Sequence, residues 1–328
     1  MAEHGIALGI DLGGTSVKVG VVNRAGEILS RGVRPTEVEK GPSGVAENIA
    51  LAVEDALQAA GMQLSGLDGV GVGTPGICDA ARGVVVSSGN LNWKNVPLAD
   101  LLQRRLGVPV RLENDANCAG LGEQWCGAAR GHDHVILYTL GTGVGGALIL
   151  GGRIYGGATG WAGELGHIRV APGGPACTCG LQGCLEAVSS ATAMAREGRE
   201  AVAAGRSPAM ARLAAEQGGR LDARVVITAA REGDPAAQQI LRQAGEYLGI
   251  VSAMLVSALN PELIVVGGGA SHAGDFLLEP MRRVIAEQAM PGPASIVRVV
   301  QASLGNDAGL IGAATLIWRW AVQNRGRS

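Results

Sequence analysis

Phenylalanine is nearly absent from this chain, whereas glycine is abundant. The 328 residues include one phenylalanine, Phe276, and 53 glycines. The glycines follow no collagen-like period, so their number indicates many tight turns and close approaches of the backbone.

Long hydrophobic runs are also missing. The longest apolar stretch, Ile250–Leu259, contains serines and ends at Asn260-Pro261, and it is too short to cross a bilayer. The N-terminal residues carry no basic segment, and Asp11 interrupts them before an apolar signal region can form. We therefore expect no signal peptide, no membrane association and a cytoplasmic location.

Basic residues show no excess. The net charge is −2, with 27 Lys and Arg against 29 Asp and Glu, so general binding to nucleic acid or to anionic membranes is not indicated. At 328 residues a single core usually divides into two, so we expect two domains.

Two common phosphate-binding motifs are absent. No G-x4-G-K-[ST] loop and no H-R-D catalytic loop occur, which excludes P-loop and protein-kinase sites. Gly141–Gly146 matches G-x-G-x-x-G by letter, but Ala147–Leu150 continues as a strand where a dinucleotide-binding motif needs a helix.

One strand–glycine turn–strand unit occurs twice. The first copy consists of the strand Ile6–Ile10, the turn Asp11–Ser16 and the strand Val17–Val22. Its residues 7–22 line up with residues 135–150, so that Asp11 falls on Thr139, Gly13 on Gly141 and Val22 on Leu150. Such a repeat predicts a duplicated architecture. The turns Gly13–Thr15 and Gly141–Gly145 are either ordinary hairpins or a pair that holds a triphosphate between them. Asp11 beside the first turn is then a candidate for Mg²⁺ coordination through water.

Helices and strands alternate in the rest of the chain. The spacing of apolar residues predicts a helix from Ser43 to Ala60, a long helix capped by Asp234, and a final helix over 307–328. Strands are expected at Glu262–Val266, which runs into Gly267-Gly268-Gly269, and at Ile296–Val300.

Three cysteines and one histidine indicate a metal site. Cys177, Cys179 and Cys184 have C-x-C-x4-C spacing, and His167 lies ten residues upstream of the first. Thiolate and imidazole groups form closed, tetrahedral structural zinc sites. The alternative is three free thiols beside a histidine, whereas a disulfide would need an oxidising compartment.

Asn114 and Asp115 stand where a predicted strand meets a predicted helix. Both residue types are good helix caps, and capping is one interpretation. The other is that Asp115 is a general base for phosphoryl transfer, with Asn114 orienting a hydroxyl group beside it.

Together these motifs resemble the ROK family (repressor, open reading frame, kinase). The resemblance rests on motifs in the family's order through most of the chain: D-L-G-G-T at 11–15, T-P-G at 74–76, E-N-D-A-N at 113–117, L-G-T-G-V-G-G at 140–146, G-E-L-G-H at 163–167, C-x-C-G-x-x-G-C-L-E at 177–186 and the triple glycine at 267–269. It implies a duplicated, two-domain α/β fold of the actin-like ATPase (ribonuclease H-like) class. Family repressors carry an N-terminal DNA-binding domain, for which we expect no room before Asp11.

The resemblance also implies roles for individual residues. Asp115 would be the catalytic base. The sugar would contact Gly76, Asn90, Asn114, Asp115, Glu164, His167 and Glu186. Mg-ATP would lie against Asp11, Gly13, Gly14, Thr15, Lys18, Gly141, Thr142, Gly143, Gly267, Gly268 and Gly269. His167, Cys177, Cys179 and Cys184 would hold a structural zinc ion.

From these roles we expect an ATP-dependent kinase that phosphorylates the 6-hydroxyl of glucose. The alternatives are a kinase for fructose, mannose, N-acetylglucosamine or N-acetylmannosamine, a non-catalytic sugar sensor, and an actin-like polymerising ATPase, which would have no use for the zinc loop. We expect an N-terminal domain over 1–120, with the last helix packed back on it, and a larger domain over 121–306. A homodimer, or a dimer of dimers, is expected from the family.

Overall fold

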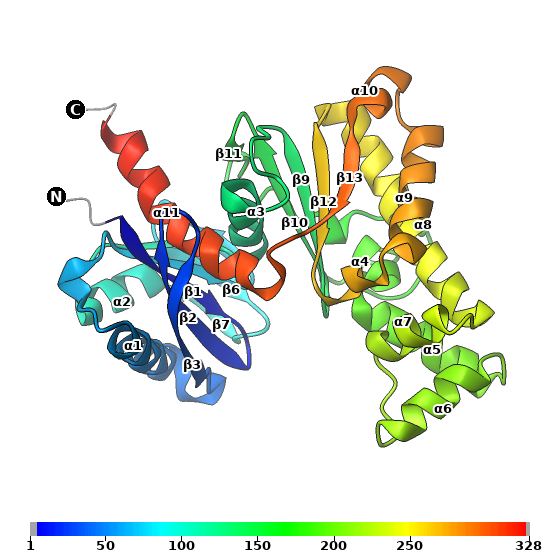
Figure 1. Cartoon of the computed structure of the whole chain (residues 1–328), viewed down its shortest axis with the longest axis horizontal. Helices are drawn as coiled ribbons and strands as arrows, with labels where there is room; N and C mark the ends of the chain where they lie inside the picture. Colours follow the sequence, from blue (N-terminus) through cyan, green and yellow to red (C-terminus); the bar gives the residue numbers. More distant parts are fainter. Residues whose placement is uncertain (1–4, 326–328) are drawn as a thin grey trace.

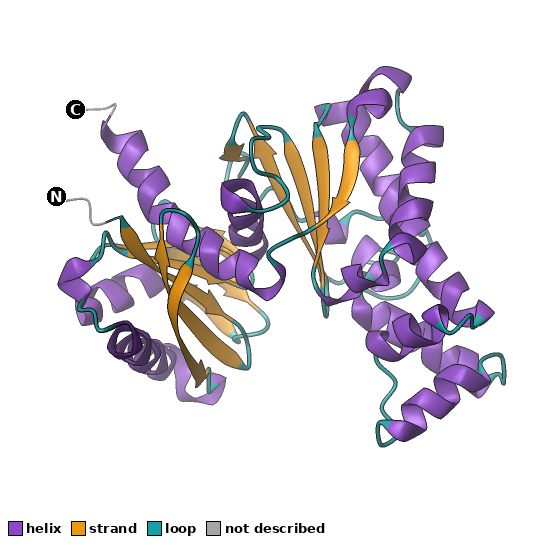
Figure 2. Cartoon of the chain, in the orientation of Figure 1, coloured by secondary structure: helices purple, strands orange, loops and turns teal. Residues whose placement is uncertain are grey.

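Two lobes, each built on a five-stranded sheet, make up the molecule (Figures 1 and 2). The computed structural model describes residues 5–325. The first sheet has the strand order β3-β2-β1-β4-β8 and the second has the order β11-β10-β9-β12-β13. In each sheet one hairpin strand pairs in parallel with a strand from later in the chain, so the two sheets share one topology.

The first sheet holds the N-terminal copy of the repeat. Its strands are β1 (Ile6–Leu12), β2 (Ser16–Asn23), β3 (Ile28–Pro35), β4 (Val70–Thr74) and β8 (Val110–Asn114). β1, β2 and β3 are antiparallel, whereas β4 and β8 run parallel to β1. A separate small sheet consists of β5 (Ile77–Asp79), β6 (Val84–Ser88) and β7 (Trp93–Val96).

The second sheet repeats the pattern. Its strands are β9 (Val135–Leu140), β10 (Val144–Leu150), β11 (Arg153–Ile154), β12 (Leu263–Gly267) and β13 (Arg298–Gln301). β9 and β10 form the hairpin that corresponds to β1 and β2, in the alignment taken from the sequence. The predicted duplication is therefore confirmed, and it places the two glycine turns at corresponding points of the two lobes.

Helices cover both faces of each sheet, so that the central strands β4 and β12 are buried throughout. One face of the first sheet packs against α1 (Gly41–Ala60) and α2 (Leu98–Leu106). The second sheet packs on one face against α3 (Asp115–Cys126). On its other face lie α4 (Leu185–Ser189), α5 (Ala191–Ala203), α6 (Pro208–Glu216), α7 (Ala223–Arg231), α8 (Pro235–Leu259) and α9 (Asp275–Gln288), with α10 (Pro291–Ile296) beside them.

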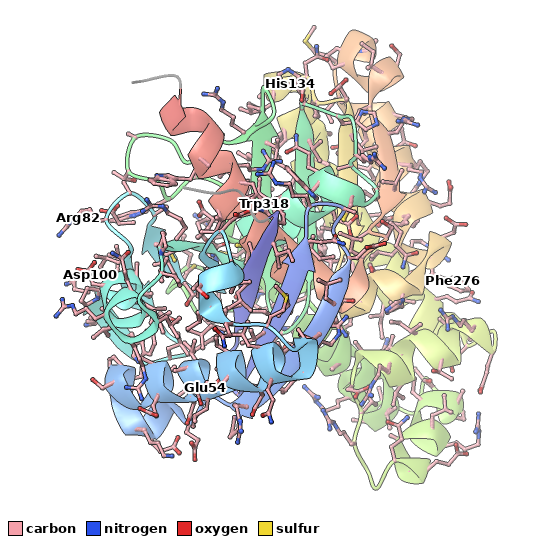
Figure 3. The ribbon with its side chains drawn as sticks, turned by 60° about the vertical axis from the view of Figure 1, so that its left-hand side comes forward. Glu54, Arg82, Asp100, His134, Phe276 and Trp318 are labelled. Carbon is pink, nitrogen blue, oxygen red and sulfur yellow. The ribbon has the colours of Figure 1, made fainter. Side chains whose placement is uncertain are left out.

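The last helix, α11 (Ala308–Arg325), returns to the first lobe. Glycines let it approach closely: a side chain on Gly9 or Gly71 would collide with the α11 backbone at Leu310 or Ala313. A side chain on Gly312 of α11 would likewise collide with the backbone carbonyl of Cys118 in α3. Trp318 of α11, labelled in Figure 3, is buried and donates to Asp68 at 2.9 Å. The first sheet, α11 and α3 thus form one tightly packed stack.

Some predicted boundaries were wrong. α1 begins at Gly41 with Lys40 as its cap, so Ser43 is not the cap, because Pro42 already fits the first turn of a helix. Ile296 ends helix α10 instead of starting the strand, which begins at Arg298. Asp234 caps α8 as expected, accepting a hydrogen bond from the N–H of Ala237 at 2.8 Å.

The proposed domain limit at 120/121 falls within α3, which runs unbroken from 115 to 126. The division into domains 1–120 and 121–306 stays a proposal. Asp307 belongs to a short 3-10 turn before α11, and 326–328 lie outside the described residues. Among the helices of residues 5–325, none has the length and apolar character needed to cross a membrane.

Candidate active site

A cavity of about 450 Å³ opens where the ends of β4 and β8 face the β9–β10 hairpin. It is lined by all seven residues expected to contact the sugar: Gly76, Asn90, Asn114, Asp115, Glu164, His167 and Glu186. Four of the glycine-turn residues expected to contact ATP also line it: Gly141, Thr142, Gly143 and Gly268. Segments from both lobes therefore contribute to one site.

Asn114 is the cap of α3, and it also keeps one donor for a ligand. Its Oδ1 accepts hydrogen bonds from the N–H groups of Ala116 (2.8 Å) and Asn117 (3.2 Å), and its Nδ2 donates to the carbonyl of Gly76 (3.0 Å). An amide nitrogen has two hydrogens, so the second has no acceptor among the described residues, and Asn114 lines the cavity. The capping and the functional interpretations of Asn114 are thus compatible.

Gly76 approaches Asn114 because its backbone has a positive φ of 99°. A side chain there would collide with the backbone of Ser87 and Ser88 in β6. Only glycine fits both constraints, and the turn brings its carbonyl onto Asn114 at the cavity wall.

Asp115 is the first residue of α3, and its surroundings favour the neutral acid. Burial raises the pKa of its carboxyl from 3.8 to about 6, the hydrogen bond from the N–H of Ala116 acts in the opposite direction, and the charges of Asp11 and Glu164 raise the pKa further. A carboxylate with a pKa near 6 is a better proton acceptor than an ordinary aspartate and is still ionised at neutral pH.

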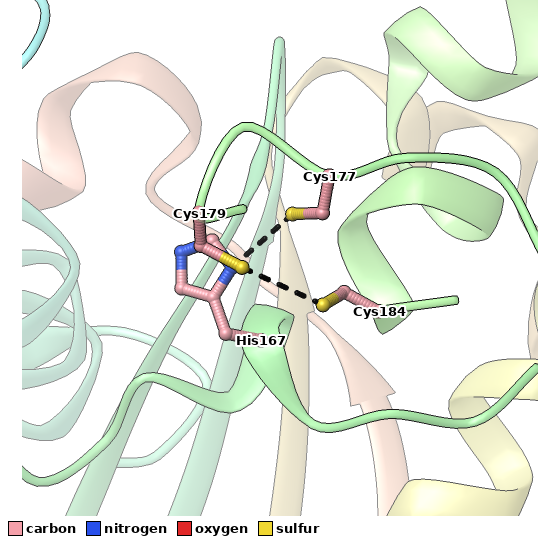
Figure 4. Close-up of side chains that lie close together, drawn as sticks. All are labelled: His167, Cys177, Cys179 and Cys184. Atoms are coloured by element: carbon pink, nitrogen blue, oxygen red, sulfur yellow. Dashed lines mark hydrogen bonds between the residues drawn. The ribbon is translucent and has the colours of Figure 1, made fainter. Parts of the chain in front are cut away.

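His167 and the three cysteines converge on one point (Figure 4), with ligand atoms all within 4.8 Å of one another. Cys179 Sγ lies 3.7 Å from Cys184 Sγ, and Cys177 Sγ lies 3.5 Å from Nδ1 of His167. A tetrahedral ion with bonds of about 2.3 Å to sulfur and about 2.05 Å to nitrogen requires separations of about 3.8 Å and about 3.6 Å. The spacing fits one metal ion and is too long for a disulfide.

The ring of His167 connects this metal cluster to the cavity. Its Nδ1 is directed at Cys177, whereas its Nε2 lies 4.0 Å from Oε2 of Glu164. Burial raises the pKa of Glu164, and the nearby His167 opposes that shift. A ligand on Nδ1 leaves the hydrogen on Nε2, which makes the cavity side of the ring a hydrogen-bond donor.

Glu186 joins the metal loop to the glycine turn of the β9–β10 hairpin. Its Oε1 accepts from the hydroxyl of Thr178 at 3.1 Å, and its Oε2 accepts from the N–H of Val144 at 3.1 Å. A side chain on Gly143 would displace the Glu186 carboxylate from this position. One carboxylate at the cavity therefore connects the metal loop with the β9–β10 hairpin.

The two glycine turns expose backbone donors. In the described chain, no acceptor is bound to the N–H groups of Gly14 and Thr15 in the first turn or of Thr142 and Gly143 in the second. Such groups bind phosphate oxygens well. Asp11, beside the first turn, lies 3.3 Å from Nζ of Lys18 on β2.

Known proteins match this chain over nearly its full length. The ROK family matches residues 7–319. The chain belongs to the ROK family. It is 42% identical to a glucokinase of Halalkalibacterium halodurans, with 94% of each chain covered, and 42% identical to a glucokinase of Thermotoga maritima, with 94% of this chain and 96% of that protein covered.

The solved structure of a ROK family glucokinase from Streptomyces griseus, in complex with glucose and AMPPNP, superposes with a TM-score of 0.83 at 37% identity, over 96% of this chain and 100% of that one. The actin-like ATPase fold expected from the sequence is thereby confirmed.

Not every residue expected at the ROK site lines the cavity. Seven of the expected ATP contacts lie outside its lining: Asp11, Gly13, Gly14, Thr15, Lys18, Gly267 and Gly269. Gly14 nevertheless borders the cavity, because a side chain there would come within 3.2 Å of the carbonyl of Asn90. The first glycine turn thus lies at the cavity's edge.

Sequence reasoning missed a second hollow of this ROK chain, of about 550 Å³, between α5 and α7. Thr142 lines both hollows, so the second continues from the glycine turn. Its polar wall contains Thr192, Arg199, Arg220 and Asp222, and Thr192 donates to the carbonyl of Thr142 at 2.8 Å. These residues belong to no recognisable motif, so only the fold brings them together.

No sequence pattern indicated that Thr178, which stands between Cys177 and Cys179, donates a hydrogen bond to Glu186. We expect Thr178→Val to raise the KM for glucose about 3- to 10-fold with kcat changed less than about twofold, because Glu186 loses one hydrogen bond that fixes its orientation. Steady-state kinetics with each substrate varied tests this. The matched control, Thr192→Val, loses the bond to Thr142 and is expected to raise the KM for ATP instead. An unchanged glucose KM in Thr178→Val would show that Thr178 is not needed to orient Glu186.

Proposed function

We propose that this protein transfers the γ-phosphoryl group of Mg-ATP to the 6-hydroxyl of glucose, giving glucose 6-phosphate. The observation that carries the proposal is Asp115, a carboxylate of raised pKa, in one cavity with the polar side chains of Asn114, Glu164, His167 and Glu186. The similarity to three glucokinases over at least 94% of the chain supports glucose as the sugar.

In the proposed reaction Asp115 accepts the proton of the 6-hydroxyl as the hydroxyl oxygen attacks the γ-phosphorus, and the bond from the γ-phosphorus to ADP breaks. Asn114 donates its free amide hydrogen to a neighbouring hydroxyl, and the carboxylates of Glu164 and Glu186 accept from others, since each sugar hydroxyl is both donor and acceptor. A site with this many polar groups discriminates strongly against a sugar that lacks one hydroxyl, because a buried partner would be left unpaired.

The triphosphate would lie between the two glycine turns, with its oxygens on the N–H groups of Gly14, Thr15, Thr142 and Gly143. From Thr142 the nucleoside would continue into the hollow between α5 and α7. Asp11 would hold Mg²⁺ through water, and the ion would neutralise charge on the phosphates. Zinc, held by His167 and the three cysteines, would be structural, since four protein ligands leave no open position.

A coupled assay of ADP release tests this function. It should compare glucose with fructose, mannose, N-acetylglucosamine and N-acetylmannosamine, and we expect the highest kcat/KM with glucose. Another preferred hexose would assign the chain to a different kinase of the family. Sugar binding with no ADP release from any hexose would support a sugar sensor instead. The expected homodimer and cytoplasmic location stay predictions.

The raised pKa of Asp115 predicts a pH dependence. Because the base must be ionised, kcat/KM for glucose should fall about tenfold per pH unit below a pKa of about 6 and level off above it. The main cause is burial, so the profile should respond little to ionic strength, which screens mainly exposed charges. A profile flat down to pH 4.5, with the enzyme still folded, would contradict the assignment of Asp115 as the base.

A further inference from the structure

A larger groove, of about 900 Å³, lies outside the catalytic cavity and shares no lining residue with it. Its walls come from the β5–β6 turn of the first lobe and from the segment 153–161 after β10 of the second lobe, and its floor comes from β8 and α11. The two walls nearly meet, because a side chain on Gly160 would lie 3.5 Å from the carbonyl of Cys78. A ligand in this groove would therefore contact both lobes.

The groove carries positive charge in a chain whose net charge is −2. Arg82, Arg111, Arg153 and Arg319 line it, against the two carboxylates of Asp79 and Glu113. Within residues 5–325 only Arg82 has an acidic partner among these arginines, and that contact with Asp79 is long, at 3.8 Å. The surplus of two positive charges would balance the roughly two negative charges of a phosphate monoester near neutral pH.

Two of these arginines are half-buried, and neither has an anionic partner among the described residues. Arg111 lies over the ring of Trp320 at 3.9 Å, and its Nε is a buried donor with no acceptor. Arg319 donates to two neutral oxygens, those of Gly152 and of the Gln124 side chain, and its Nε also lacks a partner. Burial lowers the pKa of both groups. Since partial removal of a cation from water is costly unless it is paired, an anion in the groove would stabilise these two half-buried groups.

Other lining residues fit a sugar better than a bare anion. The indole of Trp161 is 45% exposed at the groove wall and offers a flat apolar face. Asp79 and Glu113 are hydroxyl acceptors in the same groove. Glu113 uses Oε1 for the backbone N–H of Asn114 and the Nδ2 of Asn117, whereas no described group donates to its Oε2.

We propose that this groove is a second binding site that takes a phosphorylated hexose, with the phosphate on Arg82, Arg111 and Arg153 and the sugar ring against Trp161. Arg82 projects from the edge of the first lobe (Figure 3), and Arg153 is exposed, so both can reach a ligand that enters from solvent. Guanidinium groups bind phosphate through paired hydrogen bonds, which makes arginine suited to this role. The reaction proposed above produces a ligand of this class.

The test is direct binding of glucose 6-phosphate to the whole protein by isothermal titration calorimetry, with saturating glucose present. Glucose occupies the catalytic sugar site, so heat measured under these conditions reports the groove. We expect one site per chain, and a Kd that Arg111→Met and Arg153→Gln each raise about tenfold or more. The matched control is Arg242→Gln on the exposed surface of α8, which should leave the Kd unchanged.

If Arg111→Met disturbs the packing of the groove floor, Arg153→Gln still tests the proposal. Arg153 is exposed, so its substitution should leave the fold intact. Loss of binding in the presence of glucose, or a Kd that neither variant changes, would overturn the proposal. Inorganic phosphate binding as tightly as glucose 6-phosphate would overturn the sugar part. The kinase assay is independent of these outcomes: an inactive protein that binds glucose 6-phosphate here refutes the proposed function alone, and an active enzyme that fails to bind it refutes the groove alone.

Discussion

Asp115→Asn is expected to lower kcat by a factor of about 10² or more and to leave the affinity for glucose nearly unchanged, since loss of a general base removes this much catalysis. Asparagine has the same shape and keeps the oxygen that accepts from the N–H of Ala116. It cannot accept a proton from the 6-hydroxyl. The effect should therefore appear in kcat, with glucose affinity measured separately by equilibrium binding.

The same substitution should stabilise the folded protein. The pKa of Asp115 is raised from 3.8 to about 6 in the folded state. Ionisation of this carboxyl therefore costs more free energy in the folded protein than in the unfolded chain, which lowers the stability of the fold. The folded chain binds more protons than the unfolded chain between these pH values, and stability falls as pH rises through that window. Above it the penalty is fully present, on the order of 3 kcal/mol for a shift of about two pKa units. Asparagine has no charge, so it removes this penalty.

Chemical denaturation at two pH values tests this second effect. At pH 7.5 the unfolding free energy of Asp115→Asn should exceed that of the wild type by about 1–3 kcal/mol, and near pH 4 the difference should largely vanish. Asp100→Asn is the matched control, because Asp100 lies exposed on α2 (Figure 3). A variant with near-normal turnover, or one less stable than the wild type at pH 7.5, would contradict this account of Asp115.

The sequence was sufficient where a local pattern determines the structure. The repeat of the glycine hairpin predicted the paired sheets, because strand, turn and strand are adjacent in the chain. The spacing of Cys177, Cys179 and Cys184 predicted the cluster with His167, because three of its four ligands come from one short loop. The role of Asn114 as a cap also followed from its place before a helix.

What the sequence left open depends on contacts between distant segments. The raised pKa of Asp115 comes from burial and from Asp11 and Glu164, which no local pattern reveals. The double role of Glu186 needs β10 to lie against the metal loop. The hollow between α5 and α7 and the arginines of the groove are assembled from separate elements, without any motif.

Removal of the metal ion is expected to weaken glucose binding, although the ion takes no part in the reaction. In the proposed site Nδ1 of His167 would hold the ion, which would leave Nε2 directed at the cavity. It would also fix the loop that ends at Cys184, the N-cap residue of α4, and Glu186 lies in the first turn of that helix. Two of the proposed sugar contacts, His167 and Glu186, would thus depend on one ion. We expect metal-free protein to have a glucose KM raised about tenfold or more, as for loss of two hydrogen bonds to charged or polar partners.

The experiment is chelation with a strong zinc ligand, metal analysis of the product, and steady-state kinetics before and after addition of Zn²⁺. The melting temperature should fall by about 5 °C or more, because binding of a structural metal contributes to folding free energy, and Zn²⁺ should restore both the melting temperature and the glucose KM.

Cys184→Ser should reproduce the metal-free behaviour, since Cys184 is a buried member of the cluster. Cys126→Ser, at a half-buried cysteine outside the cluster, is the matched control and should keep both metal and glucose affinity. A verified metal-free protein with an unchanged glucose KM would show that His167 and Glu186 are positioned without the ion, and the link between the metal cluster and the sugar site would then be wrong.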